Sequence, residues 1–286
     1  MVDSVKIIEC PRDAMQGIKS HFIPTEAKVK YINSLLKVGF DTIDFGSFVS
    51  PKAIPQMRDT AEVLAKLDLS STTSKLLAIV ANVRGANDAS QFEEIDYLGY
   101  PFSISENFQM RNTHKTIEQS IDTLKEVLTI ANRANKEVVA YLSMGFGNPY
   151  GDPWSVEIVG EWTEKLSKLG VKILSLSDTI GSSTPEDIDY LFSNLIPGYP
   201  NIEFGAHLHT TPTKWHEKID SAFKAGCRRF DGAIKGYGGC PMAKDELTGN
   251  MPTEKMLSYF TANKVDTNVK PMSFESAYNK ALEVFL

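Results

Sequence analysis

Short apolar segments recur along the chain with a spacing of roughly thirty residues, the spacing of a repeating strand–helix unit. Each of these segments has the length and the apolar content of a buried β-strand. They span residues 5–10, 42–46, 76–81, 95–102, 138–144, 172–177, 204–209 and 228–234.

The segments between the predicted strands have helical patterns. Residues 116–132 carry an apolar residue at the helical period, and Thr184-Pro185-Glu186 has the residue order of a helix start. Further helices are predicted over residues 25–36, from Pro55, up to residue 169, over 213–225, from Pro252 and over 273–285. Strands and helices therefore alternate throughout the chain.

Eight strands that alternate with helices predict an α/β protein, a single (β/α)8 TIM barrel with a C-terminal helical extension. The barrel is expected over residues 1–264 and the extension over 265–286, as one catalytic domain. A doubly wound open sheet is the alternative. In a barrel, functional groups lie at the C-terminal ends of the strands, so the polar residues that follow each strand are the candidates for chemistry.

Composition narrows the choice of partners and compartment. The 286 residues are 42% apolar and carry a net charge of −6, which disfavours nucleic acid or an anionic membrane as the main partner. The first residues do not resemble a signal peptide, and no apolar run is long enough to span a membrane. Three cysteines fit a reducing cytoplasm better than a disulfide framework.

Two histidines end the seventh predicted strand. His207 and His209 are two residues apart, so their side chains project from the same face and could bind one metal ion. Asp13, after the first strand, is a candidate third ligand, and Asn250 could add a neutral oxygen. Such a mixed set suits Mn, Fe, Co or Zn as well as Mg, and two histidines with one carboxylate also occur in non-haem iron oxygenases, which use another scaffold.

Other polar residues lie at the predicted barrel mouth. Arg12 needs an anionic partner if it is buried there, and a carboxylate or enolate would serve. Asp44 lies in the second strand, and Asp178, at the end of the sixth, could cap a turn or face the mouth. Cys240 lies in a glycine-rich loop, which is either a plain connection or a lid that moves this thiol over the site.

Five segments together resemble 3-hydroxy-3-methylglutaryl-CoA lyase, a family of metal-dependent barrel lyases related to the isopropylmalate and homocitrate synthases. The resemblance covers nearly the whole chain. It is strongest in Pro11–Gln16 (PRDAMQ) and in residues 47–57 (SFVSPKAIPQM), 177–181 (SDTIG), 207–209 (HLH) and 238–250 (GGCPMAKDELTGN).

The resemblance implies cleavage of 3-hydroxy-3-methylglutaryl-CoA, or a close 3-hydroxyacyl-CoA, to acetyl-CoA and acetoacetate, with Mg²⁺ or Mn²⁺ as the metal and a homodimer as the assembly. It implies metal ligation by Asp13, His207, His209 and Asn250. It implies that Arg12 stabilises the enolate oxygen, and that Asp178 and Cys240 take part in proton transfer or lid closure. In the mechanism expected for such a lyase, His207 or Asp13 is the base that removes the hydroxyl proton. Gln16 and Ser47 would contact substrate. Asn82 is a candidate for the CoA pocket from its position after the third strand.

Three positions depart from the family pattern. Asp44 stands where a glutamate is usual, Thr210 where an aspartate is usual, and Ala14 where glycine is common. None of the three departures removes a predicted metal ligand. They concern the hydrogen bonds around the ligands, so a related 3-hydroxyacyl-CoA stays open as the substrate. Two other functions also remain open, a synthase that condenses acetyl-CoA with a 2-oxo acid and a non-catalytic binder of acyl-CoA or metal.

Overall fold

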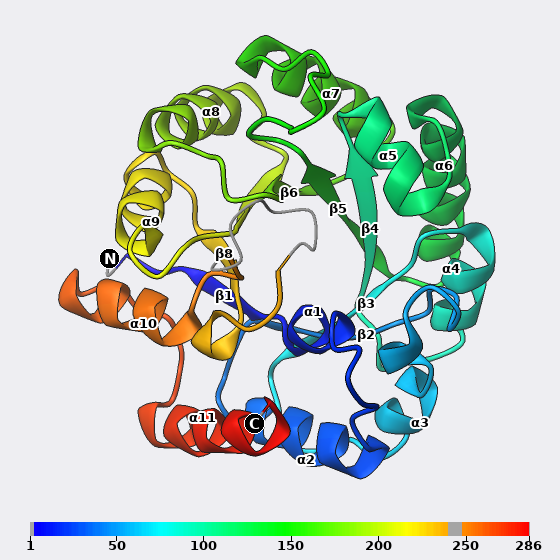
Figure 1. Cartoon of the computed structure of the whole chain (residues 1–286), viewed down its shortest axis with the longest axis vertical. Coiled ribbons are helices and arrows are strands. Elements are labelled where there is room, and N and C mark those ends of the chain that lie inside the picture. The colour runs from blue at the N-terminus through cyan, green and yellow to red at the C-terminus, as the bar shows by residue number, and fades with distance from the viewer. Residues whose placement is uncertain (1–2, 240–247, 286) are drawn as a thin grey trace.

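Eight parallel strands close into a barrel in a computed structural model that describes residues 3–239 and 248–285 (Figure 1). Neighbours in sequence are neighbours in the sheet, and β8 pairs with β1 to close it. The strands are β1 Lys6–Glu9, β2 Thr42–Ser47, β3 Lys75–Ile79, β4 Tyr97–Ser103, β5 Glu137–Ser143, β6 Ile173–Asp178, β7 Glu203–Leu208 and β8 Arg229–Gly232.

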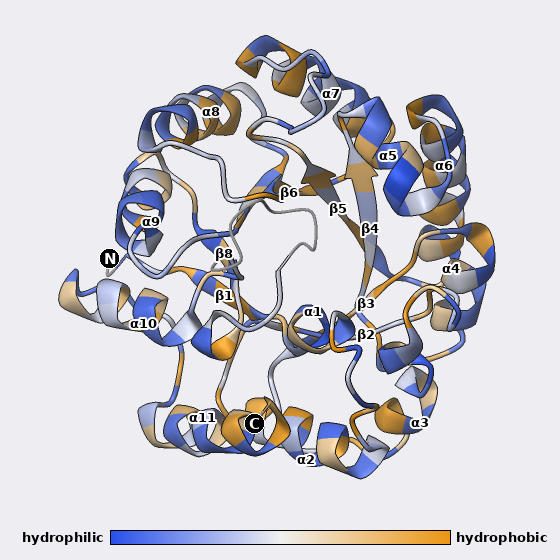
Figure 2. Ribbon diagram, viewed as in Figure 1, coloured by the Kyte–Doolittle hydropathy of each residue, from blue (hydrophilic) through white to orange (hydrophobic). Residues whose placement is uncertain are grey.

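Helices form a ring around the barrel, apart from α1, which lies inside this ring beside β2 (Figure 1). They are α1 Pro11–Gln16, α2 Thr25–Leu35, α3 Thr60–Leu64, α4 Val83–Ser90, α5 Glu106–Thr113, α6 Ile117–Arg133, α7 Val156–Lys168, α8 Pro185–Gly198, α9 Trp215–Lys224, α10 Thr253–Ala262 and α11 Pro271–Phe285. Two short 3-10 helices are η1 Pro55–Met57 and η2 Ile234–Gly236. Figure 2 shows apolar residues on the strands and on the inward faces of the helices.

The apolar side chains form two layers because strand residues alternate between the two faces of the sheet. A large cluster fills the space between the barrel and the helices. A smaller one lies inside the barrel and includes Leu77, Val139, Tyr141 and Ile173. The barrel interior is therefore packed with side chains below the mouth, and these side chains lie beneath the polar residues at the strand ends.

The TIM-barrel prediction is confirmed, with strand boundaries that differ by up to two residues. The third predicted strand began at 76 and ended at 81, whereas β3 is Lys75–Ile79. Two helices were not predicted. Helix α1 has only six residues and begins with Pro11, so it is too short to show a helical apolar period. The buried residues of α5 are Phe108 and Gln109, and its sequence has no apolar residues at the helical spacing. The predicted division into barrel and extension at residue 264 stays a prediction.

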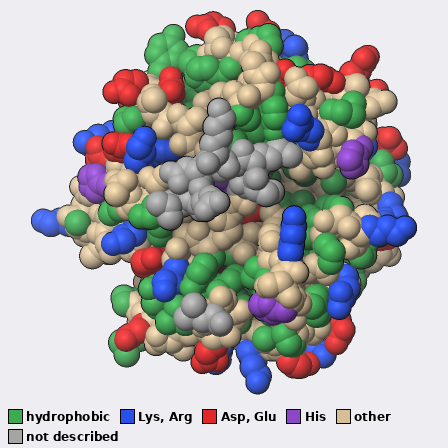
Figure 3. Space-filling model, viewed as in Figure 1, with side chains coloured by type: hydrophobic (Ala, Val, Ile, Leu, Met, Phe, Trp, Pro, Cys, Tyr) green, Lys and Arg blue, Asp and Glu red, His purple; other side chains and the backbone are tan. Residues whose placement is uncertain are grey.

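Helix α11 follows the barrel and packs against α2, where the edge of the Phe285 ring contacts Tyr31. Figure 1 shows the two helices side by side. Within the part of the chain that the structure describes, no helix is long and apolar enough to cross a membrane. The face shown in Figure 3 carries basic and acidic side chains interspersed along its rim.

Candidate active site

A cavity of about 320 Å³ opens at the C-terminal ends of the strands. Its lining comes from five predicted functional side chains and from residues of the loops around them. The lining includes Arg12, Asp13, Gln16, His207, His209, Ile54, Phe108, Asn112, Tyr141, Ser143 and Gly239. The barrel thus brings together residues from opposite ends of the sequence, as the TIM-barrel interpretation predicted.

Asp13, His207 and His209 form the centre of this site. One potential ligand atom from each lies within 4.8 Å of the other two, and the two imidazole rings are 5.3 Å apart between centroids. Burial alone would raise the pKa of Asp13, but the charge of Arg12, the two histidines in their protonated forms and the hydrogen bond from Asn250 outweigh it and hold this pKa at about 2. The carboxylate is therefore ionised at neutral pH, as a metal ligand must be.

His209 supports the metal prediction most directly. The residue is 4% exposed, and neither ring nitrogen makes a hydrogen bond of normal geometry to a described residue. A buried imidazole without a partner is costly, and a divalent cation would satisfy it. Burial and the neighbouring His207 lower the pKa of His209 to about 4, so the ring is neutral at pH 7 and able to donate a lone pair. This donor set fits a divalent ion.

Asn250 lies beside the same three residues. Its amide nitrogen donates to Asp13 Oδ2 at 2.8 Å and to the carbonyl of Tyr237 at 2.8 Å. The amide oxygen would have to turn toward an ion to ligate it, so ligation by Asn250 stays a prediction. Gly238 lies close to both α1 and Asn250, and a side chain would not fit there. A Cβ at this position would lie 2.7 Å from the Asp13 carbonyl oxygen and 2.9 Å from the Asn250 amide nitrogen.

Arg12 is buried against two carboxylates. Its Nε and Nη2 reach both oxygens of Asp44 at 2.5–3.1 Å, and Nη1 donates to Asp13 Oδ1 at 2.9 Å. Burial would lower the pKa of Arg12, but Asp44 and Asp13 more than offset it, so the guanidinium stays charged. The anionic partners predicted for Arg12 are therefore protein carboxylates, and they hold its planar side chain at the cavity wall.

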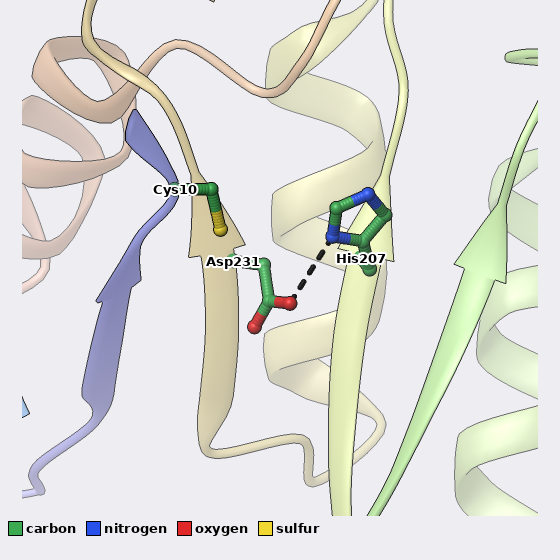
Figure 4. A group of neighbouring side chains, drawn as sticks. All are labelled: Cys10, His207 and Asp231. Carbon is green, nitrogen blue, oxygen red and sulfur yellow. Dashed lines mark hydrogen bonds and ion pairs between the residues drawn. The ribbon is translucent and has the colours of Figure 1, made fainter. Parts of the chain in front are cut away.

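Asp231 is a site residue that the sequence did not reveal. It follows an ordinary apolar strand position, and its partner His207 lies on another strand. Asp231 Oδ2 is 3.1 Å from His207 Nδ1, and Figure 4 shows the carboxylate and the ring facing each other across β8 and β7. The contact leaves Nε2, at the other edge of the ring, free for an ion. Asp231 thus selects the ring tautomer and orientation that metal binding requires.

Replacing Asp231 with asparagine is expected to weaken Mn²⁺ binding by about 10–100-fold, because the ring of His207 loses its charged orienting partner. Electron paramagnetic resonance of free Mn²⁺ during a titration measures this affinity. Asp220→Asn is the matched control, since that carboxylate binds Lys224 and Tyr259 on the barrel exterior. Equal affinity in wild type and Asp231→Asn would exclude the orienting role.

Asp178 does not point into the cavity with the others. Its carboxylate accepts hydrogen bonds from the backbone of Ser182 and Ser183, at 2.8 and 3.1 Å, and from Lys218 at 2.6 Å. Lys218 is fully buried and also donates to the His209 carbonyl at 2.8 Å. The pair holds the turn after β6 against the end of β7, which favours the turn-cap interpretation. A role in proton transfer stays a prediction.

Removing the ammonium group of Lys218 should destabilise the barrel. Lys218→Met leaves the Asp178 carboxylate buried without its charged partner, and the expected loss is about 3–5 kcal/mol in the free energy of unfolding. Urea denaturation followed by circular dichroism measures it. The control is Lys224→Met, which breaks an exposed ion pair with Asp220 and should cost at most about 1 kcal/mol. Similar losses in both variants would contradict the structural role of Lys218.

The remaining predicted residues divide between two environments. Gln16 lines the cavity and donates to Asp13 Oδ1 at 2.5 Å. Ser47 is buried, where its hydroxyl accepts from the Val49 backbone at 3.2 Å. Asn82 caps helix α4 through a bond from the Gly85 backbone to its side chain. Neither Ser47 nor Asn82 lines the described cavity, so their predicted contacts with substrate stay predictions.

Cys240 lies outside the described residues, and its role stays a prediction. The described glycines beside it are not free hinges. Gly236 has φ +67° and would place a Cβ 2.8 Å from the Asn250 carbonyl oxygen, and Gly239 has φ +134° with a Cβ position 2.8 Å from the Thr248 carbonyl oxygen. Both positions need glycine for close packing and for a left-handed backbone, so flexibility is not the reason for their sequence.

Comparisons with known proteins identify the family of this chain. The HMGL-like family model matches residues 5–280. The chain is 34% identical to the hydroxymethylglutaryl-CoA lyase of Bacillus subtilis over 260 residues, which cover 91% of this chain and 86% of the relative. It is 32% identical to the mitochondrial hydroxymethylglutaryl-CoA lyase of Bos taurus over 268 residues, which cover 93% and 81%.

Solved structures give the same result. The HMG-CoA lyase of Acinetobacter baumannii in complex with coenzyme A and 3-methylmalate superimposes with a TM-score of 0.89 at 28% identity, over 99% of this chain and 91% of that one. For the HMG-CoA lyase of Bacillus subtilis the TM-score is 0.91 at 33% identity, with 98% and 93% covered. From the family match, the shared barrel and the residues gathered at its mouth, we conclude that the chain belongs to the HMGL-like family.

Proposed function

We propose that this protein is a divalent-metal-dependent carbon–carbon lyase that cleaves 3-hydroxy-3-methylglutaryl-CoA, or a close 3-hydroxyacyl-CoA, to acetyl-CoA and acetoacetate. The observation that carries the proposal is the cluster of Asp13, His207 and His209 beside the charged Arg12. These residues combine a cation site with a positive group, which is what a retro-Claisen cleavage requires. The lyases named above are relatives of this chain by sequence and by fold.

Asp13, His207 and His209, with Asn250 as the proposed fourth ligand, would hold Mg²⁺ or Mn²⁺. Such an ion supplies Lewis acidity, which makes a substrate hydroxyl easier to deprotonate. Asp13 and His207 are the candidate bases for this proton because both line the cavity. After the hydroxyl proton leaves, its electrons form the ketone, and the bond between C2 and C3 of the acyl chain breaks.

Arg12 acts on the fragment that leaves. The electrons of the broken bond become the enolate of the acetyl thioester, whose oxygen carries the new negative charge. The guanidinium is preorganised by its bonds to Asp44 and stays charged, so it can stabilise that oxygen without reorganising. A proton is then returned to the enolate carbon, and we assign this step to the Cys240 thiol.

The departures from the family pattern bear on the substrate. Asp44 is one methylene shorter than glutamate but still bonds Arg12 through both carboxylate oxygens. Thr210 pairs its backbone with Gly249, with N–O distances of 2.9 and 3.0 Å, and so connects the end of β7 to the segment that carries Asn250. Asp44 and Thr210 thus contact other residues of the site, Arg12 and the segment that carries Asn250. We therefore propose 3-hydroxy-3-methylglutaryl-CoA as the preferred candidate substrate and a close 3-hydroxyacyl-CoA as the alternative.

The experiment that separates the lyase from a synthase follows free CoA thiol. A lyase given 3-hydroxy-3-methylglutaryl-CoA and Mg²⁺ transfers the thioester intact to acetyl-CoA, so thiol reagent detects no release while the substrate is consumed. A synthase given acetyl-CoA and a 2-oxo acid releases one thiol per turnover. Thiol release with acetyl-CoA would overturn the proposal in favour of a synthase. Inertness in both assays would favour a non-catalytic binder.

A further inference from the structure

A second group of metal-ligating side chains lies inside the barrel, beside the candidate active site. Cys10, His207 and Asp231 each offer one ligand atom, and these atoms lie within 4.8 Å of one another. The group comes from three neighbouring strand ends, of β1, β7 and β8, and Figure 4 shows the thiol, the ring and the carboxylate around one space. It shares His207 with the Asp13–His209 site but adds a sulfur ligand.

The surroundings of Cys10 differ from those of an ordinary core cysteine. Its side chain is 1% exposed, and its sulfur has a weak contact of 3.8 Å to the Ile8 carbonyl. Burial raises the pKa of this thiol, and the carboxylates of Asp231, Asp44 and Asp13 raise it further. Arg12 opposes this effect and is already paired with Asp44 and Asp13, so Asp231 is the carboxylate that a cation beside the thiol would neutralise.

Asp231 adds an independent observation. The residue is 3% exposed, and its second oxygen, Oδ1, has no hydrogen-bond partner among residues 3–239 and 248–285. Its first oxygen is already 3.1 Å from His207 Nδ1. A buried carboxylate oxygen without a donor is costly, and a cation bound between the thiol and the ring would satisfy it.

We propose that Cys10, His207 and Asp231 form a binding site for a thiophilic divalent cation such as Zn²⁺ or Cd²⁺. Sulfur selects soft cations, whereas Mg²⁺ prefers oxygen, so the site discriminates against the hard ion of the proposed catalytic centre. In tetrahedral zinc sites, bonds of about 2.0–2.3 Å place the ligand atoms roughly 3.3–3.8 Å apart. The side chains therefore need to move by about 1 Å.

Binding is balanced by the release of one proton. The Cys10 thiol loses its proton to solvent as the sulfur–metal bond forms, and Asp231 binds as the carboxylate. His207 binds through Nδ1, so the proton that Nδ1 shares with Asp231 moves to Nε2 of the same ring. With this proton on Nε2, the ring has no lone pair left for a second dication. We therefore expect Cd²⁺ or Zn²⁺ to weaken Mn²⁺ binding at the Asp13–His209 site. Inhibition of the lyase rate by Zn²⁺ would follow, and this last consequence alone rests on the proposed function.

The test is a Cd²⁺ titration of the full chain in excess Mg²⁺, followed by the ultraviolet charge-transfer band of the cadmium–thiolate bond. We expect the band to saturate at one equivalent in the wild type and in the controls Cys240→Ser and Cys227→Ser. It should be absent in Cys10→Ser and Cys10→Ala, both verified by thermal unfolding, and weaker in Asp231→Asn. Persistence of the band in folded Cys10 variants, or its loss in Cys240→Ser, would overturn the proposal.

A second readout uses the shared histidine. Cd²⁺ should weaken Mn²⁺ binding at least tenfold in the wild type, measured by paramagnetic resonance, and leave it unchanged in Cys10→Ser. An unchanged Mn²⁺ affinity in the wild type would contradict the sharing of His207. Neither readout involves substrate, so the two proposals can fail separately. If the cadmium band appears but the protein has no lyase activity, the proposed function is rejected and the Cys10 site is retained.

Discussion

His209→Ala is expected to lose the divalent ion and the lyase activity together. His209 has two buried ring nitrogens without hydrogen-bond partners among the described residues, so metal ligation is the role that its environment supports. A catalytic ion supplies several kcal/mol of transition-state stabilisation, so the turnover rate should fall by about 10³-fold or more. Isothermal titration with Mn²⁺ and the steady-state rate are measured on the same preparation.

Two further variants complete this test. Asp13→Asn removes the ionised ligand and should likewise lose both metal and turnover. His216→Ala removes an exposed imidazole on α9 that packs on Trp215, and it should retain both. Metal-dependent turnover near the wild-type rate in His209→Ala and Asp13→Asn would show that the ion binds elsewhere.

Arg12→Lys is expected to keep the metal and lose the chemistry. The positive charge near Asp13 and Asp44 is conserved, so Mn²⁺ affinity should change little. Lysine cannot reproduce the two-oxygen contact with Asp44, and its single ammonium will not be held where the enolate oxygen forms. Loss of one preorganised donor costs about 10²–10³ in turnover rate.

The readout separates binding from catalysis. The turnover number of Arg12→Lys should fall by that factor while the substrate KM stays within about tenfold, as expected for an interaction made mainly in the transition state. Arg133→Lys, an exposed change on α6, is the matched control. A variant Arg12→Lys with normal turnover would remove Arg12 from the proposed mechanism.

Much of this site follows from short-range sequence patterns. His207 and His209 share a face because strand side chains alternate, and Arg12 and Asp13 reach the mouth because they directly follow the first strand. The apolar segments alone predict the order of the eight strands. These features depend on neighbours in sequence, and local periodicity describes such neighbours well.

The residues that sequence reasoning missed depend on closure of the barrel. Asp231 meets His207 because β7 and β8 pair in one particular register, and Lys218 reaches Asp178 from a helix forty residues further along the chain. No local pattern encodes such contacts. A lysine on an amphipathic helix normally lies at the surface, so the burial of Lys218 could not be read from its position in the sequence.

The same limit explains the assignments that the structure does not favour. Asp178 and Asn82 both follow predicted strands, as catalytic residues do, but Asp178 binds the backbone of the turn after β6 and Asn82 binds the backbone of the first turn of α4. A polar side chain after a strand can turn toward the cavity or cap the next helix, and the sequence is compatible with both. Cys10 was counted only as a reduced cysteine, because its carboxylate neighbours come from other strands.

The most direct test of the proposed lyase is a product measurement. Purified protein with Mg²⁺ or Mn²⁺ and 3-hydroxy-3-methylglutaryl-CoA should form acetoacetate and acetyl-CoA in equal amounts. The products should disappear with EDTA, return when metal is restored in excess and be missing in His209→Ala. No acetoacetate from folded protein with metal bound would contradict the proposed activity on this substrate.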